Sequence, residues 1–240
     1  MPLNIGLQIS VSAIVSRKNK SSKTLPEFPH CALSSSNLTC HSPFLMVIAP
    51  PAPHAPFTPA PQYSSNYSGE TAPRLPSFNY VEPPNEAKHW LVQRHPRPLD
   101  AAIIDKIDDV FRNRWRALLS VDDMVDSIMT FLNNNGMLDN TIAMYTSDHG
   151  YHLGTFGLPL DKRQPYETDI RVPLLVRGPG VVQMERQPAL AVITTDIAPT
   201  ILDIAGLNSE DFGMDGISLY PLLKNESHHS RTVLPTFSIL

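Results

Sequence analysis

The sequence TIAMYTSDHG, residues 141–150, joins an apolar run to a cluster of polar side chains. The β-branched and aromatic residues of the run favour a buried strand at 141–147. The run stops abruptly at Asp148, His149 and Gly150. A buried strand that ends in a carboxylate, an imidazole and a glycine is a usual way to build a metal and anion site at the edge of a sheet. We therefore expect a functional site in the loop that follows this strand.

Strand-like and helix-like segments alternate through much of the chain. Further strands are expected at 44–49, 173–177 and 189–195, and helices at 100–118, 121–132 and 197–204. Ser120 and Asp196 stand where caps of the second and third helices are expected, and Asn135-Gly136 and Gly206 are stop signals. This alternation favours an α/β fold with a mostly parallel sheet flanked by helices.

The part of the chain before residue 100 is rich in proline and polar residues. Most of the 24 prolines lie there. Because proline locks φ and lacks an N–H donor, residues 50–57 are expected to form a stiff, non-helical loop and residues 58–99 a long irregular excursion. Residues 1–42 are polar and irregular, and we expect a disordered leader there.

Composition bounds the class of protein. The 240 residues are enough for one sizeable α/β domain or two small ones. The net charge of −4 argues against a nucleic-acid binder, which usually carries a basic excess. Apolar runs fall well short of the roughly 20 residues that a membrane span needs. Cys31 and Cys40 indicate neither a disulfide framework nor a zinc site.

Signals for a secretory route are weak. Four sequons begin at Asn19, Asn37, Asn66 and Asn225, and these would accept glycans in a secretory protein. The first 15 residues lack a basic region and are interrupted by polar residues, so they make a poor signal peptide. The residues themselves therefore leave the compartment open.

Asp148 and His149 are candidate metal ligands. A carboxylate at a strand end is well placed to bind a hard divalent cation, and Gly150 allows the backbone to turn sharply and to approach a ligand closely. Taken alone, the Asp-His-Gly tripeptide is more often an ordinary turn after a strand than a metal site.

Three further segments carry candidate substrate contacts. Lys162 and Arg163 would bind an anion or stabilise a leaving oxygen, or else form an exposed basic pair. His54 is held between prolines after a strand end, and its alternative is a surface position. His152 would bind substrate or pack. Each segment leaves a predicted strand, so we expect them to converge at one sheet edge.

Several motifs in this sequence resemble the sulfatase family. They are Pro53-His-Ala-Pro56, Thr146-Ser-Asp-His-Gly-Tyr-His-Leu-Gly154, Asp161-Lys-Arg-Gln-Pro-Tyr-Glu167, Asp169-Ile-Arg-Val-Pro-Leu-Leu-Val-Arg-Gly-Pro-Gly180 and Met214-Asp-Gly-Ile-Ser-Leu219. The resemblance covers residues 43–224, which it identifies as a partial catalytic domain, and leaves residues 225–240 as a tail. It implies an incomplete alkaline-phosphatase-like α/β fold.

The resemblance also implies a chemistry. Sulfatases use a cysteine oxidised to formylglycine, a calcium ion that polarises the sulfate, and basic residues that hold the sulfate oxygens. By resemblance, Asp148 and His149 are calcium ligands, Lys162 and His54 are catalytic residues, and Arg163 and His152 are substrate contacts. The implied partner is a glycosaminoglycan bearing 6-sulfated glucosamine, and the implied location is lysosomal or secreted.

The sequence departs from the family at the nucleophile. The Cys-x-Pro/Ala-Ser-Arg motif is matched neither by Cys31-Ala-Leu-Ser-Ser35 nor by Cys40-His-Ser-Pro43. We therefore expect a partial sulfatase that cannot hydrolyse sulfate esters alone. The alternatives are a fragment that binds sulfated glycan without turnover and a metal-dependent phosphatase or phosphodiesterase of the same superfamily.

Overall fold

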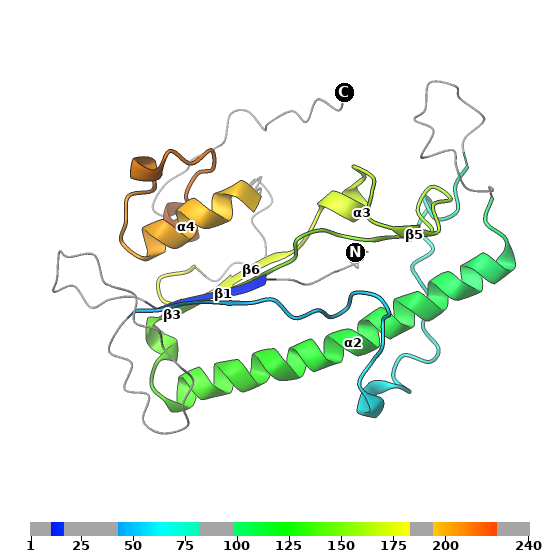
Figure 1. Cartoon of the computed structure of the whole chain (residues 1–240), viewed down its shortest axis with the longest axis horizontal. Helices are drawn as coiled ribbons and strands as arrows, with labels where there is room; N and C mark the ends of the chain where they lie inside the picture. Colours follow the sequence, from blue (N-terminus) through cyan, green and yellow to red (C-terminus); the bar gives the residue numbers. More distant parts are fainter. Residues whose placement is uncertain (1–10, 17–42, 82–97, 183–193, 225–240) are drawn as a thin grey trace. The chain divides into compact units, whose positions relative to one another are not determined.

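The computed structural model describes residues 11–16, 43–81, 98–182 and 194–224 (Figure 1). Predictions on Cys31, Cys40, the strand residues 189–193 and the tail 225–240 lie outside these residues. The chain divides into two compact units. Unit 1 includes Val47–Asn134 and Met144–Leu175, and unit 2 includes Asn135–Ala143 and Val176–Leu240.

Four strands form the main sheet of the described residues, in the order β2-β1-β3-β6. Their bounds are Val11–Ser16 for β1, Leu45–Ile48 for β2, Thr141–Thr146 for β3 and Leu174–Arg177 for β6. The strands predicted at 44–49, 141–147 and 173–177 are confirmed. The expectation of a disordered leader is wrong for β1, because this stretch of the leader, VSAIVS, is rich in β-branched residues that favour a strand.

Within the sheet, which was predicted to be mostly parallel, β3 and β6 form an antiparallel pair. The Thr146 hydroxyl donates to the Pro173 carbonyl at 2.8 Å, while at the other end of the pair Gly178 lies against the backbone of Ile142. The two strands therefore run in opposite directions. The connection between them contains only the short helix α3, Glu167–Ile170, and lacks the long crossover helix that parallel neighbours need.

A single helix, α2, runs from Ala101 to Asn134 and replaces the two helices predicted at 100–118 and 121–132 (Figure 1). Asp100 accepts a hydrogen bond from the Ile103 N–H at 2.9 Å and caps its start. The helix passes Ser120 without interruption because neither glycine nor proline occurs within it. It ends before Gly136, whose φ of 64° is the left-handed geometry expected of a stop.

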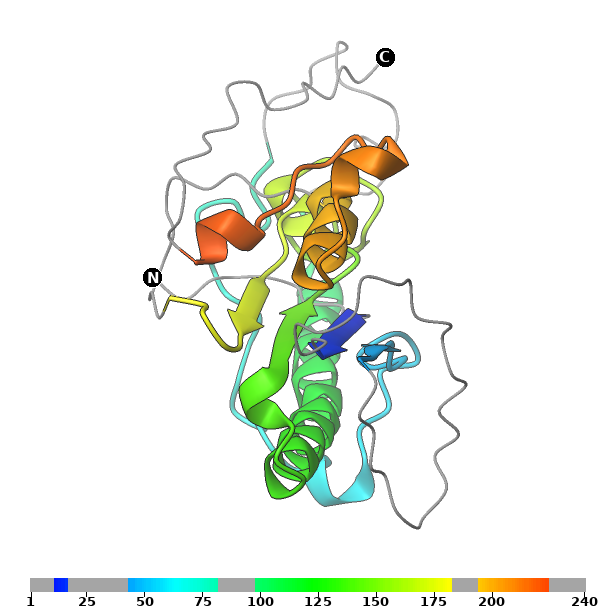
Figure 2. The same ribbon diagram turned by 90° about the vertical axis from the view of Figure 1, so that its left-hand side faces the viewer.

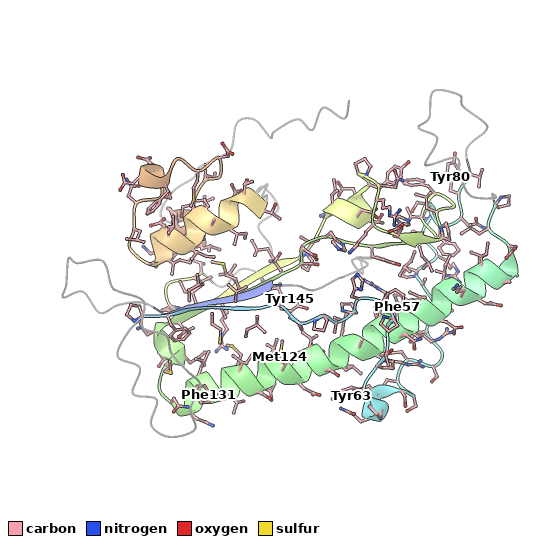
Figure 3. All side chains as sticks on the ribbon, viewed as in Figure 1. Phe57, Tyr63, Tyr80, Met124, Phe131 and Tyr145 are labelled. Carbon is pink, nitrogen blue, oxygen red and sulfur yellow. The ribbon has the colours of Figure 1, made fainter. Side chains whose placement is uncertain are left out.

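The excursion after β2 packs between α2 and the 152–161 region. Ala72 and Leu99 form a buried cluster with Ile107 and Phe111 of α2. Phe78 packs against this cluster and forms a bridge with Thr155. The figure with side chains shows the loop that carries Phe57 running along α2 (Figure 3).

Asn79 ties the two ends of the segment 79–99 to each other. Its side chain accepts from the Leu99 N–H at 2.7 Å and donates to the Leu99 carbonyl at 3.2 Å. Its backbone N–H donates to the Gly154 carbonyl at 2.7 Å. One residue thus joins the excursion, the start of α2 and the loop that follows β3.

In unit 2, α4 runs from Ile197 to Ile204 and ends before Gly206, as predicted (Figure 2). The predicted side-chain cap is wrong, because the Asp196 carboxylate accepts instead from the Ile217 N–H at 3.0 Å. Thr200, also buried, accepts from the Leu219 N–H at 2.8 Å. These two side chains fasten the 216–219 segment to α4 and lead into α5, Tyr220–Leu223.

Among the described residues, the helices are all too short or too polar to cross a lipid bilayer. The longest of them, α2, is amphipathic and carries many acidic and basic side chains.

Because Ser120 lies inside a continuous helix, we expect Ser120→Ala to raise the free energy of unfolding by a few tenths of a kcal/mol, as alanine has the higher helix propensity. Urea unfolding at equilibrium measures this. Ser127→Ala, at another position inside α2, is the matched control. A loss of about 1 kcal/mol for Ser120→Ala alone would indicate a helix cap there instead.

Candidate functional site

Asp148, His149 and Lys162 form a compact polar cluster in unit 1. The Lys162 Nζ lies 2.5 Å from the His149 Nε2, and the Asp148 Oδ2 lies 3.5 Å from the same nitrogen. The His149 Nδ1 lies 2.6 Å from the Gly150 carbonyl, which can only accept a hydrogen bond. The Nδ1 of the neutral ring therefore carries the proton, and its Nε2 presents a lone pair to the ammonium.

A short hairpin places Lys162 in this cluster. Strand β4, His152–Leu153, pairs antiparallel with β5, Leu160–Asp161, so that His152 stands opposite Asp161. Lys162 follows β5 directly, which brings it back beside the start of the loop after β3. Thirteen residues of sequence thus separate two side chains that touch in space.

The buried carboxylate of Asp169 holds this hairpin to α3. The His152 Nδ1 lies 3.0 Å from both carboxylate oxygens, and both side chains are almost fully buried. The Gln164 N–H donates to Oδ2 at 3.0 Å, and the Thr168 hydroxyl donates to Oδ1 at 3.1 Å. A buried charge is tolerated only when it is this well supplied with donors. The Asp169 carboxylate is thus the partner of the His152 ring inside the protein. The contact of His152 with substrate stays a prediction.

Gly150 allows the loop after β3 to approach α3. Its N–H donates to the Asp169 carbonyl at 2.7 Å. A Cβ at this position would lie 2.0 Å from the carbonyl oxygen of Thr168, which is far inside van der Waals contact. The glycine predicted to permit a close approach does so, although what it approaches is the protein's own backbone.

Arg114 of α2 joins the loop of His54 to the loop of His149. Its buried guanidinium lies 4.3 Å from the centre of the Tyr151 ring and 5.8 Å from that of Phe57, and it donates to the Pro53 carbonyl at 3.4 Å. The two rings meet edge to face with their centres 6.2 Å apart. A cation between two aromatic rings is an attractive arrangement, and desolvation strengthens it.

The Arg114 cation also acts on the titration of its neighbour. Burial lowers the pKa of Arg114 to about 10. Burial raises the pKa of the Tyr151 phenol above its usual value, and the positive charge of Arg114 opposes this rise. The two groups are therefore electrostatically coupled inside unit 1.

The two remaining candidates lie at the surface. His54 is exposed, and its Nδ1 lies 3.0 Å from the Ala55 carbonyl. Its loop is joined to that of Tyr151 by Arg114. Arg163 is exposed, and its Nε forms an ion pair with the Asp161 Oδ2 at 3.0 Å. An exposed ion pair of this kind agrees with the alternative that Arg163 is a solvated basic residue. Their roles in substrate binding stay predictions.

The residues that organise the site were missed by the sequence analysis. Arg114 falls on the apolar face of α2 with Phe111 and Ala117, at three-residue spacing, and a charged residue on such a face signals a buried role. Asp169 has no comparable signal, because the excursion from 148 to 171 has no periodicity.

The side chains of this cluster supply some of the ligands that a divalent cation needs. Asp148 and His149 provide one oxygen and one nitrogen 3.5 Å apart, and in this arrangement the lone pair of that nitrogen faces the Lys162 ammonium. In the described part of the chain, no group of three or more His, Cys, Asp or Glu side chains is arranged to hold a metal. Calcium prefers six to eight oxygen ligands, so these residues would supply only part of its shell.

Comparison with known proteins points to one family. The family model "Sulfatase" matches residues 30–207. The N-acetylglucosamine-6-sulfatases of Bos taurus and Homo sapiens are each 49% identical to the chain over 186 residues, which is 78% of the chain and 32% and 33% of those proteins. The chain thus spans about a third of the length of these relatives.

More distant relatives are extracellular enzymes by name. The extracellular sulfatase SULF-1 homolog of Drosophila melanogaster is 39% identical over 202 residues, covering 84% of the chain and 18% of the relative. A solved structure of BT4656 in complex with its substrate D-glucosamine-2-N,6-O-disulfate is 37% identical, covers 54% of the chain and 26% of that protein, and aligns with a TM-score of 0.47.

We expect Gly150→Ala to lower the free energy of unfolding by at least about 2 kcal/mol, because the new methyl group would collide with the backbone of α3. Urea unfolding followed by circular dichroism measures this. Gly69→Ala is the matched control, since a Cβ there meets nothing within 4 Å. Equal stabilities for the two variants would contradict the close approach.

Replacement of Asp169 by asparagine should cost about 1–3 kcal/mol of unfolding free energy, because the new amide would point a donor at groups that already donate. The matched control on the same helix is Glu167→Gln, which breaks only the exposed pair with Arg171 and should change stability by less than about 0.5 kcal/mol. Thermal unfolding of both variants decides whether Asp169 holds the hairpin.

Arg114→Met should raise the pKa of the Tyr151 phenol further, because it removes the nearby positive charge. The measurement is the alkaline absorbance titration of tyrosinate, with Tyr151→Phe in each background to isolate the one phenol. Arg114→Lys keeps the charge and should give a smaller rise. An unchanged Tyr151 titration in Arg114→Met would show that the two groups are not coupled.

Proposed function

Because the chain belongs to the sulfatase family, we propose that its polar cluster in unit 1 is the metal- and sulfate-facing part of a sulfuric ester hydrolase. The observation that carries this proposal is the contact of Lys162 with His149 beside Asp148. It joins an ammonium, an imidazole and a carboxylate from two separate loops. The alkaline-phosphatase-like α/β fold expected from the motifs agrees with membership of this family.

Asp148 and His149 are proposed to hold the divalent metal that sulfatases generally bind, with calcium as the ion. When bound, such an ion draws electron density from the sulfate oxygens. The Asp148 carboxylate is nearly half exposed, so it is open to a cation from solvent. To bind the ion, the His149 Nε2 would turn its lone pair from the Lys162 ammonium to the metal, while its Nδ1 proton stays on the Gly150 carbonyl.

Lys162 is proposed to hold a sulfate oxygen and to stabilise the charge that builds on the leaving alcohol. The β4–β5 hairpin fixes the lysine backbone, so its ammonium is preorganised within reach of an anion. His54 would contact the sulfate from the neighbouring loop, and Arg163 and His152 would contact or support the sugar. The buried position of His152 favours the supporting role.

The proposed substrate is 6-sulfated glucosamine in heparan or keratan sulfate, which places the protein in the lysosome or outside the cell. Support comes from the names of the mammalian relatives at 48–49% identity. We propose that this chain does not turn the ester over alone, since no segment matches the nucleophile motif. Binding of sulfated glycan without turnover is the second candidate, favoured by the same observation.

We expect Lys162→Ala to weaken the binding of N-acetylglucosamine 6-sulfate by about 10- to 100-fold, because the lysine would make a charge-assisted hydrogen bond to the sulfate. Isothermal titration calorimetry with calcium present measures this, and unsulfated N-acetylglucosamine shows how much of the binding depends on the sulfate. Lys106→Ala, at an exposed lysine of α2, is the matched control.

Two outcomes would change this proposal. Equal affinity of the wild type for the sulfated and unsulfated sugar would remove the sulfate-facing role of Lys162. Turnover of an aryl sulfate by the wild type, lost in Lys162→Ala, would overturn the proposed inactivity and leave the assignment of the site in place.

A further inference from the structure

The sequon Asn66-Tyr67-Ser68 lies in a surface turn of unit 1, after the short 3-10 helix η1, Pro61–Tyr63. Asn66 and Ser68 are both exposed. The other sequons, at Asn19, Asn37 and Asn225, lie outside the described residues. Asn66 is therefore the one sequon within the described residues.

The backbone of Asn66 is held while its side chain is left free. Its N–H donates to the Tyr63 carbonyl at 3.1 Å, and its carbonyl accepts from the Arg116 Nε at 2.6 Å. Within the described residues, the side-chain amide of Asn66 makes no hydrogen bond. A group attached to this amide would thus break none of the contacts that hold the turn.

An aromatic pair lies next to this turn, since Tyr67 follows Asn66 directly in the chain. The Tyr67 ring meets the Trp115 ring edge to face, with their centres 5.2 Å apart. Trp115 also packs on Phe111, with the ring centres 4.6 Å apart. The Trp115 residue is nevertheless 40% exposed. The exposed part of this ring offers a flat apolar face, and the C–H face of a sugar ring is a suitable cover for it.

The charges around this surface favour a neutral sugar over a sulfated one. Arg116 donates to Asn66 and to the Asn113 side chain. Arg112 donates to the Glu70 carbonyl and pairs with Asp109. At least two N–H donors of each arginine are therefore engaged within the protein, which leaves these side chains less suited to a bidentate contact with a sulfate group.

We propose that Asn66 carries an N-linked glycan whose first N-acetylglucosamine packs over Trp115. The Asn66 side-chain nitrogen attacks the anomeric carbon of an oligosaccharide linked to a polyprenyl diphosphate. An N–C bond forms, the C–O bond to the diphosphate breaks and the diphosphate leaves with the electron pair. The amide proton passes to a base of the transferase. The inference rests on the proposed function only for the secretory route.

The test expresses the full chain behind an added secretion signal, with a carboxyl-terminal tag that carries an efficient sequon. Only tag-glycosylated molecules are scored, so that every one has met the transferase. Peptide mass spectrometry after enzymatic removal of the glycan in heavy-oxygen water reports occupancy at Asn66. Ser68→Ala destroys the sequon but keeps Asn66, and Ser68→Thr preserves the sequon.

We expect Asn66 to be occupied in the wild type and Ser68→Thr, and unoccupied in Ser68→Ala. Empty Asn66 in tag-glycosylated wild type would overturn the proposal. In a Trp90→Phe background Trp115 is the sole tryptophan, and we expect about twofold stronger acrylamide quenching of its fluorescence in Ser68→Ala than in Ser68→Thr. Equal quenching would overturn the packing over Trp115. Neither readout involves Lys162, so both stand apart from the sulfate-binding test.

Discussion

The cluster of Asp148, His149 and Lys162 depends on the burial of one carboxylate. Asp169 is almost without solvent contact, and an unpaired charge there would be costly. The chain meets this cost by bringing donors from β4, from the residues after Lys162 and from α3 to the same two oxygens. Since these donors belong to the segments that flank the lysine, satisfying the carboxylate also fixes where the lysine stands.

A second buried charge, Arg114, acts on the other side of the same loop. It comes from α2, which is rigid and continuous, and it lies against both Tyr151 and Phe57. The two buried charges have different roles. Asp169 sets the hairpin that carries Lys162, whereas Arg114 sets the distance between the loops of His54 and His149. Both charges make their contacts to the segments that carry the candidate residues.

Apolar runs and glycine stop signals predicted most element positions correctly, whereas the division of the long helix was predicted wrongly. The strands near 44–49, 141–147 and 173–177 follow from apolar runs, and the ends of α2 and α4 follow from glycines. The break expected at Ser120 was wrong because a single polar residue does not stop a helix that lacks glycine and proline. No direction was predicted for β6, because the direction of a strand depends on the length of its connection and not on the strand itself.

The same limit applies to the site. The strand end at Asp148 and the position of Gly150 could be read from the sequence, because a buried run followed by polar residues is a local signal. The contact between Lys162 and His149 could only be expected from convergence of loops. The support from Asp169 is a long-range hydrogen-bond network among residues without periodicity, and no local pattern reports it.

Two hydrogen bonds between Asn79 and Leu99 hold the two ends of the intervening segment together. The segment between these two residues therefore begins and ends at the same place, whatever its length. Insertions or deletions in that stretch would therefore leave the lysine and its hairpin in place.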